Sequence, residues 1–180
     1  NNQGNQNNNS TNDNNKKYNI NGVVWLDSDK DGQRNNSEQL LSNIKVKLYN
    51  SNTNSLLKET TTNENGKYEF SQLETNNYMI LFEYDTNNYT VTAYQKNGVD
   101  KTVNNDAIEK EVSINGKEQI VGVTNTINLD NNEENIDMGL IKNSIFDLSL
   151  NKYVTKVTVT NSSGSKEYNY KNGKLEKVEI

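Results

Sequence analysis

The stretch that most constrains this fold is a twelve-residue acidic loop that follows directly after a run of apolar and β-branched residues. Counted from its first aspartate, oxygen-bearing side chains stand at positions 1, 3, 5, 7, 9 and 12, which is the ligand spacing of an EF-hand calcium loop. Gly32 occupies position 6, where such a loop must turn sharply. The predicted metal ligands are Asp27, Asp29, Asp31, Gln33, Asn35 and Glu38.

The chemistry of calcium explains this spacing. Ca²⁺ binds about six to eight oxygen atoms, and alternate residues of a coiled loop turn their side chains toward one centre. Position 7, Gln33, offers its backbone carbonyl, and Glu38 offers two carboxylate oxygens. The acidic groups of the loop would repel one another without a cation. A chance match is the alternative, because ordinary surface turns are also rich in Asp, Asn and Gly.

The residues around the loop predict strands instead of the two helices of an EF-hand. The entering segment, residues 20–26 (INGVVWL), is rich in β-branched residues and contains a glycine. Position 8 is Arg34 and not the apolar residue through which EF-hand loops pair, so no partner loop is expected. The loop is therefore predicted to connect two strands.

The composition narrows the classes of fold and function. Apolar residues make up only 31% of the chain, which favours many short strands with polar turns, and we predict an all-β fold. The chain has no cysteine and no histidine, which excludes disulfides, zinc-type sites and the commonest general base. No apolar run reaches membrane-spanning length and the N-terminus lacks the pattern of a secretory signal, as expected for a piece of a longer protein.

Short segments of alternating or β-rich sequence predict a two-sheet sandwich. Tyr68 and Phe70 are expected to point inward after an Asn-Gly turn, whereas Lys45 and Lys47 are expected on a solvent-facing side. Trp25 is expected in the core, with stacking against a carbohydrate as the alternative. Strands are predicted at residues 18–26, 44–49, 56–62, 67–70, 78–83 and 89–94, and near 109–114, 121–127 and 135–141.

The two ends of the chain differ from its middle. Residues 1–17 form an Asn-rich tract that we interpret as a disordered linker, with an aggregation-prone segment as the alternative. Residues 143–180 regain strand composition, for example at 146–154, but are too few to close an independent core. We predict that they are the opening strands of a truncated second β domain, after a main domain at 18–142.

Three stretches in this order resemble the B-type repeat domains of the serine-aspartate repeat surface proteins of Gram-positive bacteria. They are residues 24–27 (VWLD) leading into the acidic loop, 60–70 (TTTNENGKYEF) and 136–140 (IDMGL). The resemblance covers about residues 18–142 and implies a calcium-bound, Greek-key β-sandwich of the collagen-binding-protein B type, which is immunoglobulin-like. It also implies that Asn35 contacts the metal through water.

The resemblance implies two further features. Family members carry more calcium on a later acidic loop, and the residues that match it here are Asp100, Asn104 and Asp106. The tail resembles the first strand of pilin-type and adhesin domains, in which a lysine forms an internal isopeptide bond, and Lys152 is the matching position. Its partner strand does not occur in this sequence, so an ordinary lysine is expected.

The function implied by the resemblance is structural. We expect a calcium-stabilised spacer, or stalk, in an extracellular, cell-wall-anchored surface protein, with calcium ions and neighbouring domains as partners. The alternative is an adhesive module that binds a host extracellular protein or glycan directly. No enzyme is expected, because the acidic residues cluster as metal ligands. Neither nucleic-acid binding nor membrane insertion is expected, since the net charge is −5 and no basic cluster occurs.

Overall fold

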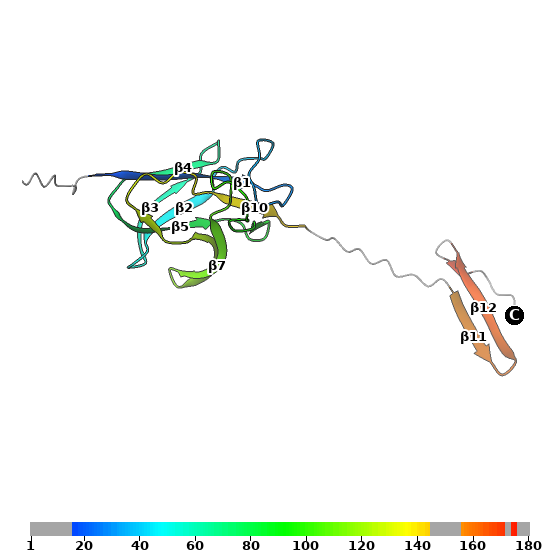
Figure 1. The fold of residues 1–180 in the computed structure, drawn as a ribbon. Coiled ribbons are helices and arrows are strands. Elements are labelled where there is room, and N and C mark those ends of the chain that lie inside the picture. Colours follow the sequence, from blue (N-terminus) through cyan, green and yellow to red (C-terminus); the bar gives the residue numbers. More distant parts are fainter. Residues whose placement is uncertain (1–15, 145–155, 172–173, 176–180) are drawn as a thin grey trace, which may run out of the picture. The chain divides into compact units, whose positions relative to one another are not determined.

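The computed structural model describes residues 16–144, 156–171 and 174–175, and every regular element in these ranges is a β-strand (Figure 1). The chain divides into two compact units, residues 1–144 and 145–180. Within the described ranges, no helix is both long and apolar enough to cross a membrane.

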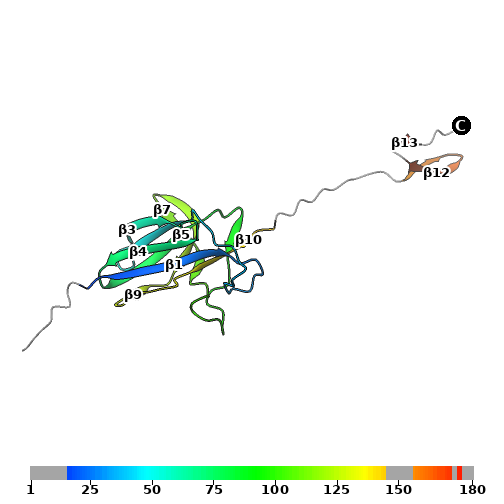
Figure 2. The same ribbon diagram turned by 90° about the horizontal axis from the view of Figure 1, so that it is seen from above.

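The first unit is a sandwich of two β-sheets (Figure 1 and Figure 2). Its strands are β1 (Tyr18–Leu26), β2 (Lys45–Asn50), β3 (Ser55–Thr61), β4 (Lys67–Leu73), β5 (Asn76–Glu83), β6 (Tyr89–Val91), β7 (Ala107–Ile114), β8 (Lys117–Thr124), β9 (Ile127–Leu129) and β10 (Met138–Lys142). One sheet has the order β4-β1-β10-β6, and the other has the order β3-β2-β5-β8-β7 with β9 paired to β5. The arrangement confirms the predicted immunoglobulin-like β-sandwich.

The core between the sheets consists of side chains that alternate along the strands. Tyr68 and Phe70 are buried as predicted, and Tyr68 meets Phe82 edge to face with ring centroids 5.6 Å apart. Trp25 has no exposed surface, so it is a core residue and cannot stack on a carbohydrate. A Cβ atom on Gly139 would lie 2.5 Å from the Trp25 ring, and only glycine allows this approach.

The strand that enters the first unit runs beside the strand that leaves it. β1 pairs in parallel with β10, with Val24 opposite Met138 and Leu26 opposite Leu140. On its other side β1 pairs antiparallel with β4. The acidic loop therefore begins at the end of a strand that pairs with a neighbouring strand on each edge.

The outer side of the larger sheet differs from the sequence-based prediction. Lys45 is exposed as predicted, but Lys47 is buried and its ammonium group pairs with the carboxylate of Glu83. Lys47 lies opposite Leu81, which belongs to a second, small apolar cluster on this side of the sheet. Because that cluster covers part of the outer face, alternation along β2 does not imply a fully solvent-exposed side.

The strand predicted at residues 121–127 is interrupted in the structure. β8 begins earlier, at Lys117, and ends at Thr124, and the chain resumes as β9 at Ile127. The backbone N–H of Ile80 donates to the hydroxyl of Thr124 at 3.0 Å where the β5–β8 pairing ends. A side-chain acceptor here allows the chain to leave the ladder without a buried, unpaired N–H group.

The second unit contains β11 (Lys156–Asn161), β12 (Gly164–Lys171) and β13 (Lys174–Leu175), which form an antiparallel sheet in this order. β11 and β12 agree with the strand composition noted for residues 143–180. The predicted strand at 146–154 and Lys152 lie outside the described residues. That this unit opens a truncated second domain stays a prediction.

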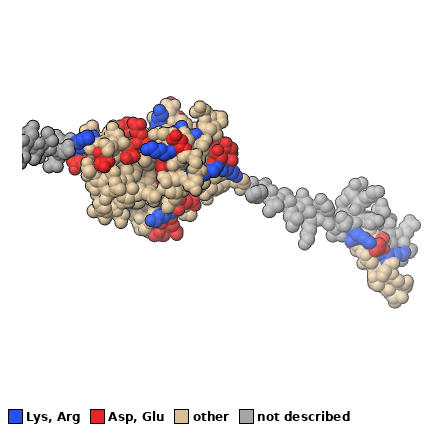
Figure 3. Space-filling view, in the orientation of Figure 1, with Lys and Arg blue, Asp and Glu red and all other residues tan. Residues whose placement is uncertain are grey.

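Charged side chains are mixed on the face of the first unit seen in Figure 3, where lysines and arginines lie among aspartates and glutamates. The described charges on this face do not form one continuous patch of a single sign.

Candidate metal centre

The acidic loop leaves the end of β1 and returns to the same strand. The N–H of Leu26 donates to the carbonyl of Gln39, and the N–H of Leu41 donates to the carbonyl of Val24, both at 2.8 Å. These strand-type hydrogen bonds close the base of the loop. The loop thus connects extended segments, as its flanking residues predict, and no helix adjoins it.

Asp27 is the residue around which the loop coils. Its side chain is 1% exposed, and its two carboxylate oxygens accept hydrogen bonds from the N–H groups of Asp31 at 3.1 Å and Gly32 at 2.9 Å. The hydroxyl of Thr92, next to β6, also donates to this carboxylate. Gly32 has a φ of +76°, a left-handed conformation that glycine adopts without steric cost. Position 6 of the loop therefore turns as predicted.

Three carboxylates gather at the mouth of this loop. One oxygen each from Asp27, Asp29 and Glu38 lies within 4.8 Å of the other two. Glu38 is held in place because its two oxygens accept the N–H groups of Ser28 at 2.8 Å and Asn35 at 3.0 Å. Carboxylates this close repel one another unless a cation or a proton lies between them.

The donor set of this group fits a hard cation. All three side chains offer oxygen, which suits Ca²⁺ and Mg²⁺ better than the softer transition metals. None of the ion pairs formed by the described residues involves Asp27, Asp29 or Glu38. A buried carboxylate without a cationic partner is unusual in proteins, and a bound metal ion would supply the missing charge.

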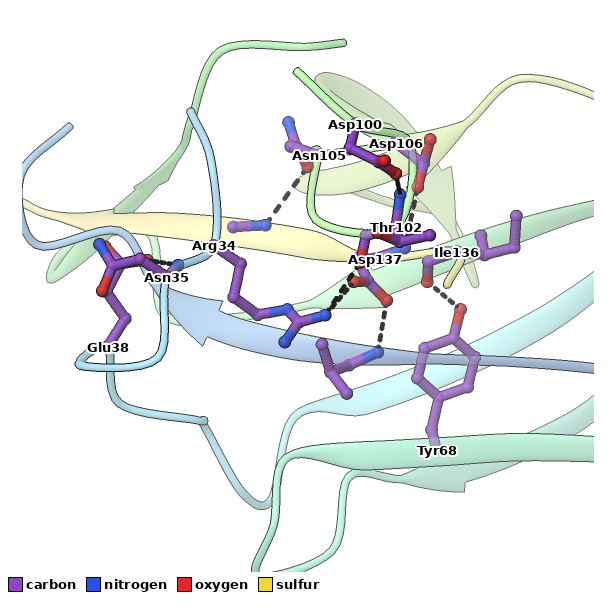
Figure 4. Close-up of polar contacts among 12 residues, drawn as sticks. Arg34, Asn35, Glu38, Tyr68, Asp100, Thr102, Asn105, Asp106, Ile136 and Asp137 are labelled. Atoms are coloured by element: carbon purple, nitrogen blue, oxygen red, sulfur yellow. Dashed lines mark hydrogen bonds and ion pairs between the residues drawn. The ribbon is translucent and has the colours of Figure 1, made fainter. Parts of the chain in front are cut away.

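Of the other three predicted ligands, Asp31 lies outside this close carboxylate group, whereas the side-chain amide of Asn35 donates to Oδ2 of Asp29 at 3.3 Å. Asp31 accepts the N–H of Gln33 at 2.7 Å, and Asn35 accepts the N–H of Ser37 at 3.0 Å. These short-range contacts shape the loop backbone, as Asx-type turns do. Figure 4 shows Asn35 and Glu38 side by side on the loop.

The prediction that the loop has no partner is wrong. Gln33 and Asn104 form an antiparallel bridge, and the N–H of Arg34 donates to the carbonyl of Val103 at 2.8 Å. The segment between β6 and β7 thus pairs with positions 7 and 8 of the acidic loop. The pairing uses backbone atoms, so an arginine at position 8 does not prevent it.

The Arg34 side chain connects the loop to a buried carboxylate in front of β10 (Figure 4). Its Nη2 atom donates to the carbonyl of Thr102 at 3.0 Å and lies 3.4 Å from Oδ2 of Asp137. Asp137 is 1% exposed and also accepts the N–H of Val23 at 2.8 Å. Burial raises the pKa of Asp137 to about 6, although these hydrogen bonds and Arg34 oppose the rise.

The residues predicted for a second site make separate contacts. Asp100 is exposed and accepts the N–H of Thr102 at 2.8 Å, which lowers its pKa. Asp106 accepts the amide of Gln95 at 3.1 Å, and burial raises its pKa. Asn104 is buried, and its Oδ1 atom has no hydrogen-bond partner among the described residues. Such an orphaned acceptor is compatible with a cation ligand.

Two residues at this end of the sandwich were not identified as functional candidates from the sequence. Asp137 joins Arg34 to β1, and its N–H donates to Asp106 at 3.0 Å. Thr92 joins β6 to Asp27. The signal for Asp137 was present, because an acidic residue within the apolar segment 136–140 requires polar partners when it is buried. A threonine beside a strand carries no comparable signal.

Residues 18–140 match the SdrD B-like domain family. The chain belongs to this family. Its relatives include serine-aspartate repeat-containing protein I of Staphylococcus saprophyticus, which is 34% identical over 78% of this chain, and serine-aspartate repeat-containing protein F of Staphylococcus epidermidis (strain ATCC 12228 / FDA PCI 1200), which is 40% identical over 54%. A fibrinogen-binding protein of S. epidermidis is 32% identical over 68% of this chain. This SdrD B-like chain spans only 7%, 6% and 10% of their respective lengths.

Proposed function

We propose that this SdrD B-like domain is a calcium-stabilised spacer in an extracellular, cell-wall-anchored surface protein. The observation that carries the proposal is the close approach of the carboxylates of Asp27, Asp29 and Glu38. The carboxylate of Asp27 is buried and has no cationic partner among the described residues. Calcium is plentiful outside cells, where even a low-affinity loop is filled.

Calcium bound only to the folded domain stabilises it by mass action, by about 2.7 kcal/mol when free calcium exceeds the dissociation constant a hundredfold. That is a large part of the net stability of a small domain. The loop also holds other parts of the sandwich, because its backbone pairs with Val103 and the side chain of Arg34 reaches Asp137. Metal binding would therefore tighten one whole end of the sandwich.

The strand pairing supports a role in bearing tension. A spacer is pulled through the strand by which the chain enters and the strand by which it leaves, and here these are β1 and β10. Because the two strands are parallel neighbours, pulling at Tyr18 and at Lys142 loads their hydrogen bonds in shear, so several must break together. The N–H of Asp27 extends this pairing by donating to the carbonyl of Leu140 at 2.8 Å.

The proposal is tested by thermal unfolding of the chain in excess calcium and then in excess chelator. We expect a clearly higher midpoint with calcium. The variant Asp27→Ala should lose this shift, while Glu64→Gln, which removes an exposed carboxylate outside the acidic loop, should keep it. An unchanged midpoint on chelation of the unaltered chain would contradict the calcium proposal.

A second candidate function is direct adhesion to a host extracellular protein or glycan. One relative is named a fibrinogen-binding protein, although this chain covers only 10% of it. The edge strand β3 also exposes two leucines, Leu56 at 48% and Leu57 at 47%, and an exposed sheet edge can accept an additional strand. Binding of the isolated chain to immobilised fibrinogen or to a glycan array would favour adhesion over the spacer role.

We propose no enzymatic activity for this domain. The acidic residues of the loop accept hydrogen bonds from backbone N–H groups of the same loop, and the chain contains neither histidine nor cysteine. Hydrolysis that depends on Asp27 would overturn this view.

A further inference from the structure

We propose that Asn97 is a site of spontaneous deamidation in the folded protein, which converts it to aspartate and isoaspartate. The proposal concerns the Asn97–Gly98 pair in the segment between β6 and β7, and it does not depend on calcium binding. The sequence contains four other Asn-Gly pairs, and the structure distinguishes this pair from the three others that it describes.

The reaction needs no enzyme. The backbone nitrogen of the glycine attacks the side-chain carbonyl carbon of the asparagine, a C–N bond forms, and ammonia leaves. Water then opens the resulting succinimide ring at either carbonyl, which yields aspartate or isoaspartate. Glycine favours the attack because it has no side chain to hinder the nitrogen, but the nitrogen must be free of hydrogen bonds and the backbone must be able to rotate.

The Asn97–Gly98 pair meets these requirements. Both residues are exposed, and apart from the chain neighbours no atom lies within 4 Å of the place where a Cβ of Gly98 would be. They are the central residues of a turn closed by one hydrogen bond, from the N–H of Val99 to the carbonyl of Lys96 at 3.1 Å. No hydrogen bond from the N–H of Gly98 occurs among the described residues. Little therefore resists rotation of this peptide unit.

Two of the other pairs are blocked by packing and hydrogen bonds. Gly22 lies within β1 opposite Tyr68, and a Cβ there would be 2.0 Å from a backbone oxygen, so the Asn21 backbone is held extended. Gly66 is buried, and its N–H donates to the carbonyl of Asn63 at 2.9 Å. In both places the nitrogen cannot reach the side chain until the sheet opens.

The Asn115–Gly116 pair is exposed but is held by its hairpin. Both residues have left-handed φ values, +53° and +75°, as a two-residue turn between antiparallel strands requires. Ile114 and Lys117 pair directly below the turn, and the β7–β8 register continues from there to Ala107. Attack by the Gly116 nitrogen would require the turn to unwind against this register.

Conversion at Asn97 adds a negative charge next in sequence to a lysine that contacts the acidic loop. The neighbouring Lys96 donates its ammonium group to the backbone carbonyl of Asp31 at 2.6 Å. The product carboxylate would lie one residue from this contact. Deamidation at this one position would therefore make the folded protein more acidic with time.

The test compares deamidation rates in the folded chain and in the same chain unfolded in urea. Both samples are incubated at mildly alkaline pH, digested and analysed by peptide mapping that separates aspartate and isoaspartate products. We expect a folded-to-unfolded rate ratio close to one at Asn97 and a strongly reduced ratio at Asn21, Asn65 and Asn115. The pair Asn172–Gly173 lies outside the described residues, so Asn172→Gln is introduced in every sample of this second comparison. In that background Asn97→Gln should lose the first acidic species seen on ion exchange, and the matched control Asn115→Gln should keep it.

A ratio at Asn97 as low as that at Asn115 would overturn the proposal. Persistence of the same early acidic species in Asn97→Gln would also overturn it. Because the ratio at each position is internal to one chain, a general loss of folding would be seen as equal rates at all positions and would not imitate the expected pattern.

Discussion

Arg34 of the acidic loop and Asp137 in front of β10 form an ion pair of 3.4 Å although 103 residues separate them in the sequence. The pair joins the candidate metal loop to the strand by which the chain leaves the sandwich. Both partners are mostly shielded from water, with the Asp137 side chain 1% and the Arg34 side chain 24% exposed. Removing one partner of such an ion pair destabilises the folded protein chiefly because the other charge stays buried without a partner.

We expect Arg34→Ala to lower the free energy of unfolding by about 1–3 kcal/mol, because it leaves the Asp137 carboxylate buried without its cation. Urea denaturation measures the change, and Lys101→Ala, which removes an exposed lysine of the neighbouring segment, should have little effect. In Arg34→Ala/Asp137→Asn the loss should be smaller than the sum of the two single losses. Strict additivity would show that the two side chains are not coupled.

The raised pKa of Asp137 predicts a pH dependence for the calcium-free domain. The unfolded chain has the ordinary aspartate pKa, and burial raises the folded value to about 6, so the folded state binds the proton more tightly. Asp137 therefore contributes most to stability at pH values below its unfolded pKa, and this contribution is lost as the pH rises through about 6. In chelator, the free energy of unfolding of Asp137→Asn, taken relative to that of the unaltered chain, should therefore increase as the pH is raised from acidic to neutral. A difference that is constant across this range would contradict the assignment.

The coiled backbone of the acidic loop should require glycine at position 6. Gly32→Ala forces a side chain into a left-handed φ of +76° and places its Cβ 3.2 Å from that of Ala93, so we expect a loss of about 1 kcal/mol or more. Gly116→Ala is the matched control, since Gly116 has a similar φ of +75° but open space around it. Thermal unfolding of both variants separates backbone strain from the contact with Ala93. Equal losses would show that the contact is unimportant.

Calorimetric titration should show a tighter calcium-binding event at the first loop and a weaker one that depends on Asn104 and Asp106. The orphaned Oδ1 atom of Asn104 and the raised pKa of Asp106 are the observations behind the second event. Asp106→Asn should remove the weaker event and leave the tighter one, while Asp27→Ala should remove the tighter one. An isotherm of Asp106→Asn identical to that of the unaltered chain would rule out the second site.

Local patterns in the sequence were sufficient for the all-β class, for most strand positions and for the turn of the acidic loop at Gly32. Strand alternation and the Asn-Gly turn depend on neighbouring residues alone, which is why Tyr68 and Phe70 could be placed in the core. The coil around Asp27 is equally local, because residues four and five positions later bond to its carboxylate. The glycine at position 6 follows from the same short-range geometry.

Only the tertiary structure decided which distant segments meet. The bridge from Gln33 to Asn104, the contact from Thr92 to Asp27 and the pair of Arg34 with Asp137 depend on how the two sheets pack and where β10 inserts beside β1. The burial of Lys47 likewise depends on an apolar cluster formed across β5 and β8. The acidic loop could therefore be recognised from its own residues, but its partner segment could not, because pairing through backbone atoms leaves no residue-type signal in the sequence.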